Sequence, residues 1–344
     1  MSVAGGGHVV FITEGGPEVG LGHVSRCAAL ARAAIADGGR VSLLVSEDAH
    51  VASVLDAVPA DVVFVPWQVD PGSALRTVSA RVPDVIVVDS YAASPAFLAS
   101  LRGLAPVVAV DDLADRPLPV DVVVNGGAGA GRLPYERHPD TLFLLGPRYA
   151  LLDARYAEAP GPAPGGHVGR VLICLGGGRH VETIVAALGA VDRVFADCVV
   201  DVAAGPFSAG STELDEAARA ARNRVFIRPG RFGLQTLMLT ADVAISGGGV
   251  TLHELAATAT PTVAVCMADN QRPNVRAFDE AGATLAGGAA GDPALGAAME
   301  SALRRLAVDG ALRASMGARG RALVDGQGAM RVARAILRPA VSGR

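Results

Sequence analysis

The feature that most constrains this chain is a regular alternation of short apolar runs with longer helical patterns. In the first half, the runs are rich in valine and leucine and occupy 8–12, 41–45, 61–65, 84–88, 107–110, 120–125 and 142–145. Runs of this length, separated by helical stretches, indicate parallel strands joined by crossover helices. We therefore expect a doubly wound, Rossmann-like sheet in the first half.

The same pattern begins again after a stretch rich in proline and glycine. This stretch, residues 158–169, reads EAPGPAPGGHVG and has the composition of a linker. Further strand-like runs follow at 170–175, 198–203, 224–227, 242–245 and 262–265, and the tail 293–337 is helical in pattern. The sequence predicts an α/β protein with two Rossmann-like domains, 1–157 and 170–344, and a cleft between them. The last helices are expected to pack back on the N-terminal domain.

Composition excludes several classes of protein. Of the 344 residues, 51% are hydrophobic and 19% are charged, which favours two large cores over disorder. The net charge is −4 and no basic run stands out, so we expect no nucleic-acid partner. The start lacks a signal-peptide pattern and no apolar run is long enough to span a bilayer, so we expect a cytoplasmic protein without a membrane partner. The four cysteines are scattered, which argues against a disulfide framework or a zinc site.

The first candidate site is the segment 20–26, Gly-Leu-Gly-His-Val-Ser-Arg, between the first predicted strand and the first predicted helix. Ligands of open α/β sheets bind at this end of a strand. Gly20 and Gly22 allow the backbone to approach a ligand, and the helix start favours an anion or a polarised oxygen. His23 is placed to face the cleft, although a plain tight turn with an exposed histidine has the same sequence pattern.

The second candidate site follows the predicted strand 242–245. Gly247, Gly248 and Gly249 precede a helix, and their backbone amides can cradle a phosphate. Glu254 lies about one and a half turns further on, where a carboxylate can accept hydrogen bonds from both ribose hydroxyls. The alternative is a glycine-rich turn with a solvated glutamate.

Two more segments are candidates for contact with a sugar or a phosphate. Asn270 and Gln271 follow the predicted strand 262–265, and an amide-rich helix cap is the alternative. Gly177 lies in the glycine turn after the first strand of the second half, as a further candidate for backbone contact.

Carboxylates at predicted strand ends raise the question of a metal. Asp89 and the pair Asp111 and Asp112 face either the cleft or the core. The stretch 111–115, Asp-Asp-Leu-Ala-Asp, is not an Asp-x-Asp metal motif, and nothing else in the sequence suggests a metal site. We therefore expect neither a metal nor a cofactor.

Taken together, these segments resemble one family, the UDP-sugar hydrolase of pseudaminic acid biosynthesis and its relatives, the spore-coat polysaccharide biosynthesis proteins. The family carries Ile-Gly-x-Gly-His-x-x-Arg-Cys, Asp-Ser-Tyr, Asp-Asp, Tyr-x-Leu-Leu, a glycine-rich helix start and Asp-Asn-Gln. The matching residues here are 19–27, 89–91, 111–112 with 121–125, 149–152, 247–254 and 269–271. More distantly, the family resembles the N-acetylglucosaminyltransferase that makes lipid II.

The resemblance implies a GT-B fold that binds a nucleotide sugar, and it adds Arg26 and Tyr91 to the sugar or phosphate side. Departures from the family at Glu14, Asp153 and the pair Arg179 and His180 leave the identity of the sugar and the acceptor open.

Three functions are compatible with these residues. The first is hydrolysis of a UDP-sugar at its anomeric carbon with inversion, with His23 as the general base on water. The second is a glycosyltransferase in which an acceptor hydroxyl replaces water. The third is a nucleotide-sugar binding protein without activity, against which the presence of both His23 and Glu254 argues.

Overall fold

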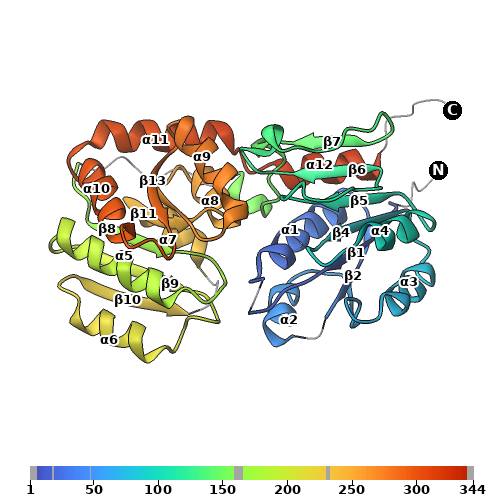
Figure 1. The fold of residues 1–344 in the computed structure, drawn as a ribbon, viewed down its shortest axis with the longest axis horizontal. Coiled ribbons are helices and arrows are strands. Elements are labelled where there is room, and N and C mark those ends of the chain that lie inside the picture. Colours follow the sequence, from blue (N-terminus) through green and yellow to red (C-terminus); the bar gives the residue numbers. More distant parts are fainter. Residues whose placement is uncertain (1–5, 18, 47, 159–165, 230–232, 339–344) are drawn as a thin grey trace. The chain divides into compact units, whose positions relative to one another are not determined.

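The protein is described by a computed structural model that covers residues 6–17, 19–46, 48–158, 166–229 and 233–338. The chain divides into two compact units, one formed by residues 1–154 with 326–344 and the other by residues 155–325. Most of the predicted linker, residues 159–165, lies outside the described residues. Each unit is a parallel sheet with helices on both faces (Figure 1).

The first unit contains a parallel sheet in the order β3-β2-β1-β4-β5-β6-β7. Its strands are β1 (His8–Thr13), β2 (Arg40–Val45), β3 (Asp61–Phe64), β4 (Val85–Asp89), β5 (Val107–Val110), β6 (Val122–Asn125) and β7 (Leu142–Leu145). Its helices are α1 (Gly22–Ala36), α2 (Ala49–Leu55), α3 (Pro71–Ser79), α4 (Pro95–Arg102) and α12 (Gly328–Leu337). Every residue of β1 and β4 is buried, as expected for central strands covered on both faces.

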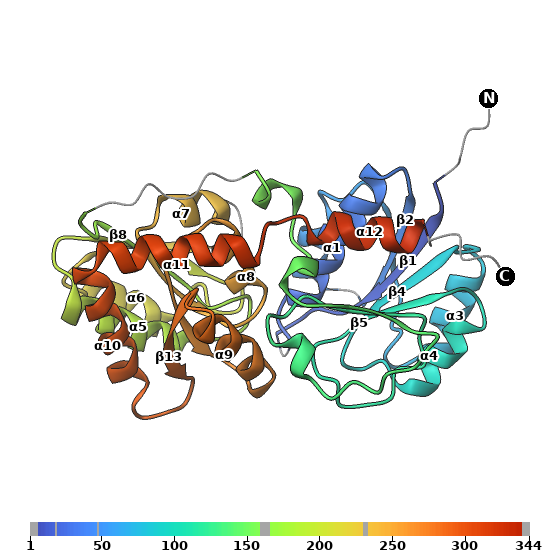
Figure 2. The ribbon, with the colours of Figure 1, turned by 90° about the horizontal axis from the view of Figure 1, so that it is seen from above.

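Helix α12 belongs to the first unit although the chain reaches it only after the whole second unit. Its buried residues include Val332 and Ile336, which are spaced so that they form one face, and this helix packs against α1 (Figure 2). Asp37, the residue that caps the end of α1, lies 3.2 Å from Arg338 and 3.6 Å from Arg334. An apolar helix face and two ion pairs therefore attach the C-terminal helix to α1.

The second unit repeats the architecture with the strand order β10-β9-β8-β11-β12-β13. Its strands are β8 (Arg170–Cys174), β9 (Val199–Ala204), β10 (Arg224–Pro229), β11 (Val243–Gly247), β12 (Thr262–Cys266) and β13 (Thr284–Ala289). Its helices are α5 (Val181–Val194), α6 (Thr212–Ala220), α7 (Leu234–Thr240), α8 (Val250–Ala257), α9 (Arg272–Glu280), α10 (Leu295–Val308) and α11 (Gly310–Leu323).

The predicted fold class of two doubly wound parallel sheets is confirmed. One strand was missed: β13 reads Thr-Leu-Ala-Gly-Gly-Ala, and glycine and alanine have a low preference for strands. Tertiary packing explains one of its glycines, because a side chain on Gly287 would meet Val263 of the neighbouring strand at 2.6 Å. Within the described parts of the chain, none of the helices combines the length and apolar character needed to cross a membrane.

Candidate functional site

The candidate site of the first unit centres on His23, the second residue of α1. Strands β1 and β4 are parallel neighbours, with Thr13 opposite Asp89, so the start of α1 meets the end of β4. The His23 Nδ1 atom lies 2.6 Å from Oδ1 of Asp89. Only 4% of His23 and none of Asp89 is exposed, which rules out the alternative of an exposed histidine on a plain turn.

Arg26 lies one turn further along α1 and faces the same carboxylate. Its Nε donates to Oδ2 of Asp89 at 2.6 Å and its Nη2 donates to Oδ1 at 2.7 Å. Its Nη1 also donates to Asp112, the second residue after β5, at 3.0 Å. Burial by itself would raise the pKa of Asp89, but the Arg26 guanidinium and His23 outweigh burial and lower it to about 2. Asp89 is therefore an anion at neutral pH.

Tyr91 closes another side of this group. Its ring meets the His23 ring edge-on, with 4.5 Å between the centroids, and its backbone N–H donates to Oε1 of Glu14 at 2.8 Å. Burial, and then the negative charge of Asp112, raise the pKa of the Tyr91 phenol. The phenol therefore stays protonated.

The neighbouring Asp111 has a different role. Its Oδ2 accepts hydrogen bonds from the backbone N–H of Ala114 at 2.8 Å and from the Tyr135 hydroxyl at 2.9 Å. Burial raises its pKa. Asp111 thus fixes the turn after β5, whereas Asp89 and Asp112 hold Arg26. Among the described residues, no group of His, Cys, Asp and Glu side chains has the arrangement of a metal site.

In the second unit, the structure brings together the loops after β8, β11 and β12. A side chain on Gly247 would meet the Leu175 carbonyl at 2.7 Å, and one on Gly248 would meet Val275 at 2.4 Å. The side-chain oxygen of Gln271 accepts hydrogen bonds from the Gly248 amide at 2.9 Å and from the Met267 amide at 3.1 Å. Close packing, as well as any ligand, therefore requires glycine here.

Gln271 accordingly has a structural role that its sequence position does not reveal, since it ties the loop after β12 to the loop after β11. The predicted phosphate donor at Gly248 is engaged by this side chain in the structure. Asn270 lies beside Gln271 in the same turn of 3-10 helix, Asp269–Gln271.

The two remaining candidates of the second unit lie near the same sheet edge. Gly177 belongs to the loop after β8, where a side chain on Gly205 of the next loop would meet its Cα atom at 2.9 Å. Glu254 is the fifth residue of α8 and is 4% exposed. It is therefore not the solvated surface glutamate of the alternative interpretation.

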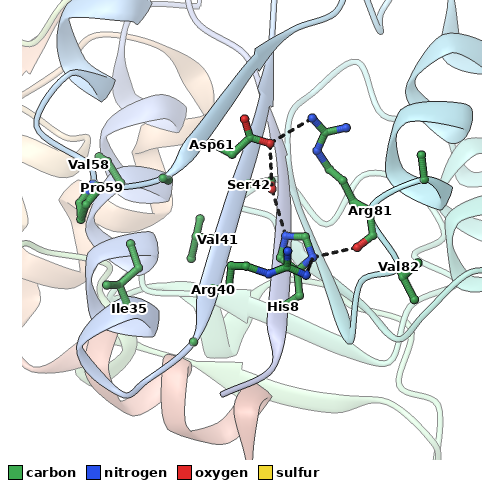
Figure 3. Close-up of a pocket in the computed structure, with 13 residues that line it drawn as sticks. His8, Ile35, Arg40, Val41, Ser42, Val58, Pro59, Asp61, Arg81 and Val82 are labelled. Carbon is green, nitrogen blue, oxygen red and sulfur yellow. Dashed lines mark hydrogen bonds and ion pairs between the residues drawn. The ribbon is translucent and has the colours of Figure 1, made fainter. Parts of the chain in front are cut away.

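A hollow of about 1180 Å³ at the opposite ends of the first unit's strands was not predicted from the sequence. His8, Arg40 and Asp61, each the first residue of its strand, line it with Ser42 and Arg81. Figure 3 shows the His8 ring hydrogen-bonded to the Arg81 carbonyl at 2.9 Å and to the Ser42 hydroxyl at 3.0 Å. Polar residues are common where strands begin at a solvent-facing end of a sheet. The positions of His8, Arg40 and Asp61 in the sequence therefore did not indicate a hollow. The hollow lies away from His23 and Asp89, which are at the carboxyl ends of the same sheet.

Comparisons with known proteins define the class of this fold. The solved structure of MurG from Acinetobacter baumannii superposes with a TM-score of 0.66 at 16% identity, covering 96% of this chain and 99% of that chain. A UDP-glucosyltransferase from Polygonum tinctorium gives a TM-score of 0.66 at 12% identity, covering 98% and 99%. The two units together therefore have the GT-B fold.

A curated relative narrows the resemblance further. The chain is 25% identical over 335 residues to the spore coat polysaccharide biosynthesis protein SpsG of Bacillus subtilis, a match that covers 94% of this chain and 96% of the relative. No family model matches the chain.

Proposed function

We propose that the protein is a glycosyltransferase that moves the sugar of a UDP-sugar to an acceptor hydroxyl, with His23 as the general base. The observation that carries the proposal is the buried pair of His23 and Asp89 at the carboxyl edge of the first sheet. The Nε2 atom of His23 has no hydrogen-bond partner among the described residues, so it is available to a reacting group. Similarity in fold to a UDP-glucosyltransferase over nearly the whole chain supports the choice of donor.

The proposed chemistry follows from the orientation of the ring. The Asp89 carboxylate accepts a hydrogen bond from Nδ1–H of His23, so the lone pair of the ring is on Nε2. There it takes the proton of the acceptor hydroxyl. The acceptor oxygen forms a bond to the anomeric carbon as the bond from that carbon to the diphosphate oxygen breaks. The electron pair leaves with UDP, and attack from the opposite side inverts the anomeric carbon.

The second unit is proposed to hold the nucleotide. Glycines 247–249 precede α8, and the first turn of a helix has amides without partners inside the helix. Since the Gly248 amide already donates to Gln271, we assign the diphosphate to Gly249 and the first turn of α8. Glu254 is assigned to the ribose, and Asn270 to the sugar or the leaving phosphate.

Hydrolysis is the second candidate, and the match of residues 19–27 to the UDP-sugar hydrolase pattern favours it. The discriminating experiment incubates the protein with a panel of UDP-sugars, first alone and then with candidate acceptors, and measures UDP and sugar products by mass spectrometry. Release of UDP only with an acceptor supports transfer, and equal release of UDP and free sugar without one supports hydrolysis. If neither occurs with any donor while UDP binds, the protein is a binding protein and the proposal is wrong.

Glu254→Ala should weaken UDP binding about 10- to 100-fold, because loss of a charged acceptor for two ribose hydroxyls costs about 1.5–3 kcal/mol. Isothermal titration calorimetry with UDP measures this directly. Glu254→Gln preserves the size of this buried side chain and separates the loss of charge from a packing defect. Unchanged UDP affinity in the folded alanine variant would reject the ribose assignment.

Gly22→Ala tests whether the backbone at the start of α1 approaches the substrate. Among the described residues, a Cβ built on Gly22 meets no atom within 4 Å beyond its chain neighbours and its own helix backbone, and alanine is favoured over glycine in a helix by up to about 1 kcal/mol. We therefore expect an unchanged or higher melting temperature. Turnover should fall by about tenfold or more, because the added methyl displaces the sugar.

Gly20→Ala is the matched comparison for this test. Gly20 has φ of 71°, so alanine there should lower the melting temperature through backbone strain. A Gly22→Ala protein with wild-type turnover would show that the substrate does not approach this position.

A further inference from the structure

Arg26 is anchored to two protein carboxylates. All three guanidinium nitrogens donate to Asp89 or Asp112, at 2.6, 2.7 and 3.0 Å. The arginine side chain is only 14% exposed, against 0% for Asp89 and 29% for Asp112. Two hydrogen bonds to one carboxylate fix both the position and the rotation of that carboxylate. The arrangement is that of a buried anchor for Asp89.

The same guanidinium also lies beside the histidine. Nη2 of Arg26 is 3.1 Å from Nδ1 of His23, which at the same time is 2.6 Å from Oδ1 of Asp89. Asp89 attracts a second proton to the imidazole, and the cation at 3.1 Å repels it. The other titratable groups at this cluster are Asp112, which shares Arg26, and Tyr91, whose ring contacts His23.

Cys27 is a further titratable neighbour, with its thiol 3.7 Å from Oδ2 of Asp89. Burial raises the pKa of this thiol, so it is neutral and adds no charge to the cluster. Among the described residues, the charges nearest to the His23 ring are therefore the Asp89 carboxylate, which contacts it directly, and the Arg26 cation beside it.

We propose that Arg26 is a positioning residue for His23, and not a ligand of the sugar or the diphosphate as its sequence motif suggests. It holds Asp89 so that Oδ1 accepts a hydrogen bond from Nδ1–H of His23, which leaves the lone pair of the ring on Nε2. The importance of this device for turnover rests on the proposed function of His23 as the base. The geometry itself does not depend on which sugar or acceptor is used.

The test compares Arg26→Lys and Arg26→Gln with Arg32→Gln as the matched control. Arg32 lies on the same helix and pairs with Asp153 at 3.1 Å, away from the His23 cluster. Three quantities are measured: UDP affinity by calorimetry, the NMR titration of the His23 ring, and the pH dependence of kcat/KM. Arg26→Lys keeps the charge but loses the two-pronged contact, so it covers the case in which Arg26→Gln does not fold.

We expect both Arg26 variants to bind UDP within about twofold of the wild type, since no donor of Arg26 is assigned to the nucleotide. In Arg26→Gln the midpoint of the His23 ring titration should move to higher pH, with a smaller move in Arg26→Lys, because the positive charge 3.1 Å from Nδ1 has been removed or displaced. The acidic limb of kcat/KM should move in the same direction, and Arg32→Gln should change none of the three quantities.

A loss of UDP affinity of tenfold or more in the folded Arg26→Lys protein would make Arg26 a substrate ligand and overturn the proposal. A ring titration that stays at the wild-type midpoint in the folded variants would overturn it as well. Failure of the proposed function looks different: His23→Ala would then retain full turnover, or no UDP-sugar would be consumed. The ring titration and the UDP affinity would still report on Arg26 in either case.

Discussion

His23→Ala is expected to lower turnover by about 10²–10⁴ while UDP affinity stays nearly unchanged. That range is the usual contribution of a positioned general base. The affinity should persist because the nucleotide is assigned to the second unit, whereas His23 lies in the first. Steady-state kinetics with the UDP-sugar found active in the donor panel, together with calorimetry for UDP, measures both effects.

Two further variants sharpen the result. His23→Asn retains a hydrogen-bonding side chain, so partial recovery of turnover would indicate that the imidazole only donates a hydrogen bond. His8→Ala removes another buried histidine, at the start of β1 and away from the His23 cluster, and should leave turnover unchanged. Wild-type turnover in His23→Ala would place the base elsewhere, and a parallel loss of UDP binding would make His23 a binding residue.

Asp89→Asn should reduce turnover by a comparable factor, about 10²–10⁴, although the side chain keeps its shape. An amide donates a hydrogen bond to Nδ1, which moves the ring proton to Nε2 and leaves His23 in the wrong tautomer for a base. Removing one member of a buried ion pair should also cost about 3–5 kcal/mol of unfolding free energy. Kinetics measures the loss of turnover and chemical denaturation the loss of unfolding free energy. Calorimetry should show an unchanged UDP affinity.

The control for lost stability is Asp201→Asn in the second unit. Asp201 is 1% exposed and also pairs with two arginines, Arg170 and Arg228. It should lose similar stability without losing turnover, because it lies in the middle of β9 and not at the carboxyl edge. Turnover that falls equally in both variants would mean that the Asp89 effect is only instability.

The effect of pH on stability gives a separate check on Asp89. Its folded pKa of about 2 is below the ordinary value of 3.8, so its ionised form stabilises the fold. That contribution is complete above the ordinary value and is lost as the pH falls through about 2. Asp89→Asn should therefore lose less stability on acidification than the wild type.

The sequence by itself determined the two sheets and most of their strands. Buried parallel strands are continuous apolar runs, and short runs such as Val107–Val110 and Leu142–Leu145 stand between turn residues that mark their ends. Both glycine-rich helix starts and His23 could be predicted as candidate sites, because each lies at the start of the first helix after such a run. These features are local, so neighbouring residues are enough to define them.

Only the tertiary structure decided what surrounds those residues. Asp89 reaches His23 from 66 positions away because β4 pairs with β1 on the side opposite β2. Strand order is set by long-range packing and leaves no periodic signal in either segment. The same reason hid the contact of Gln271 with Gly248, since that contact depends on which surfaces bury one another after the chain has folded.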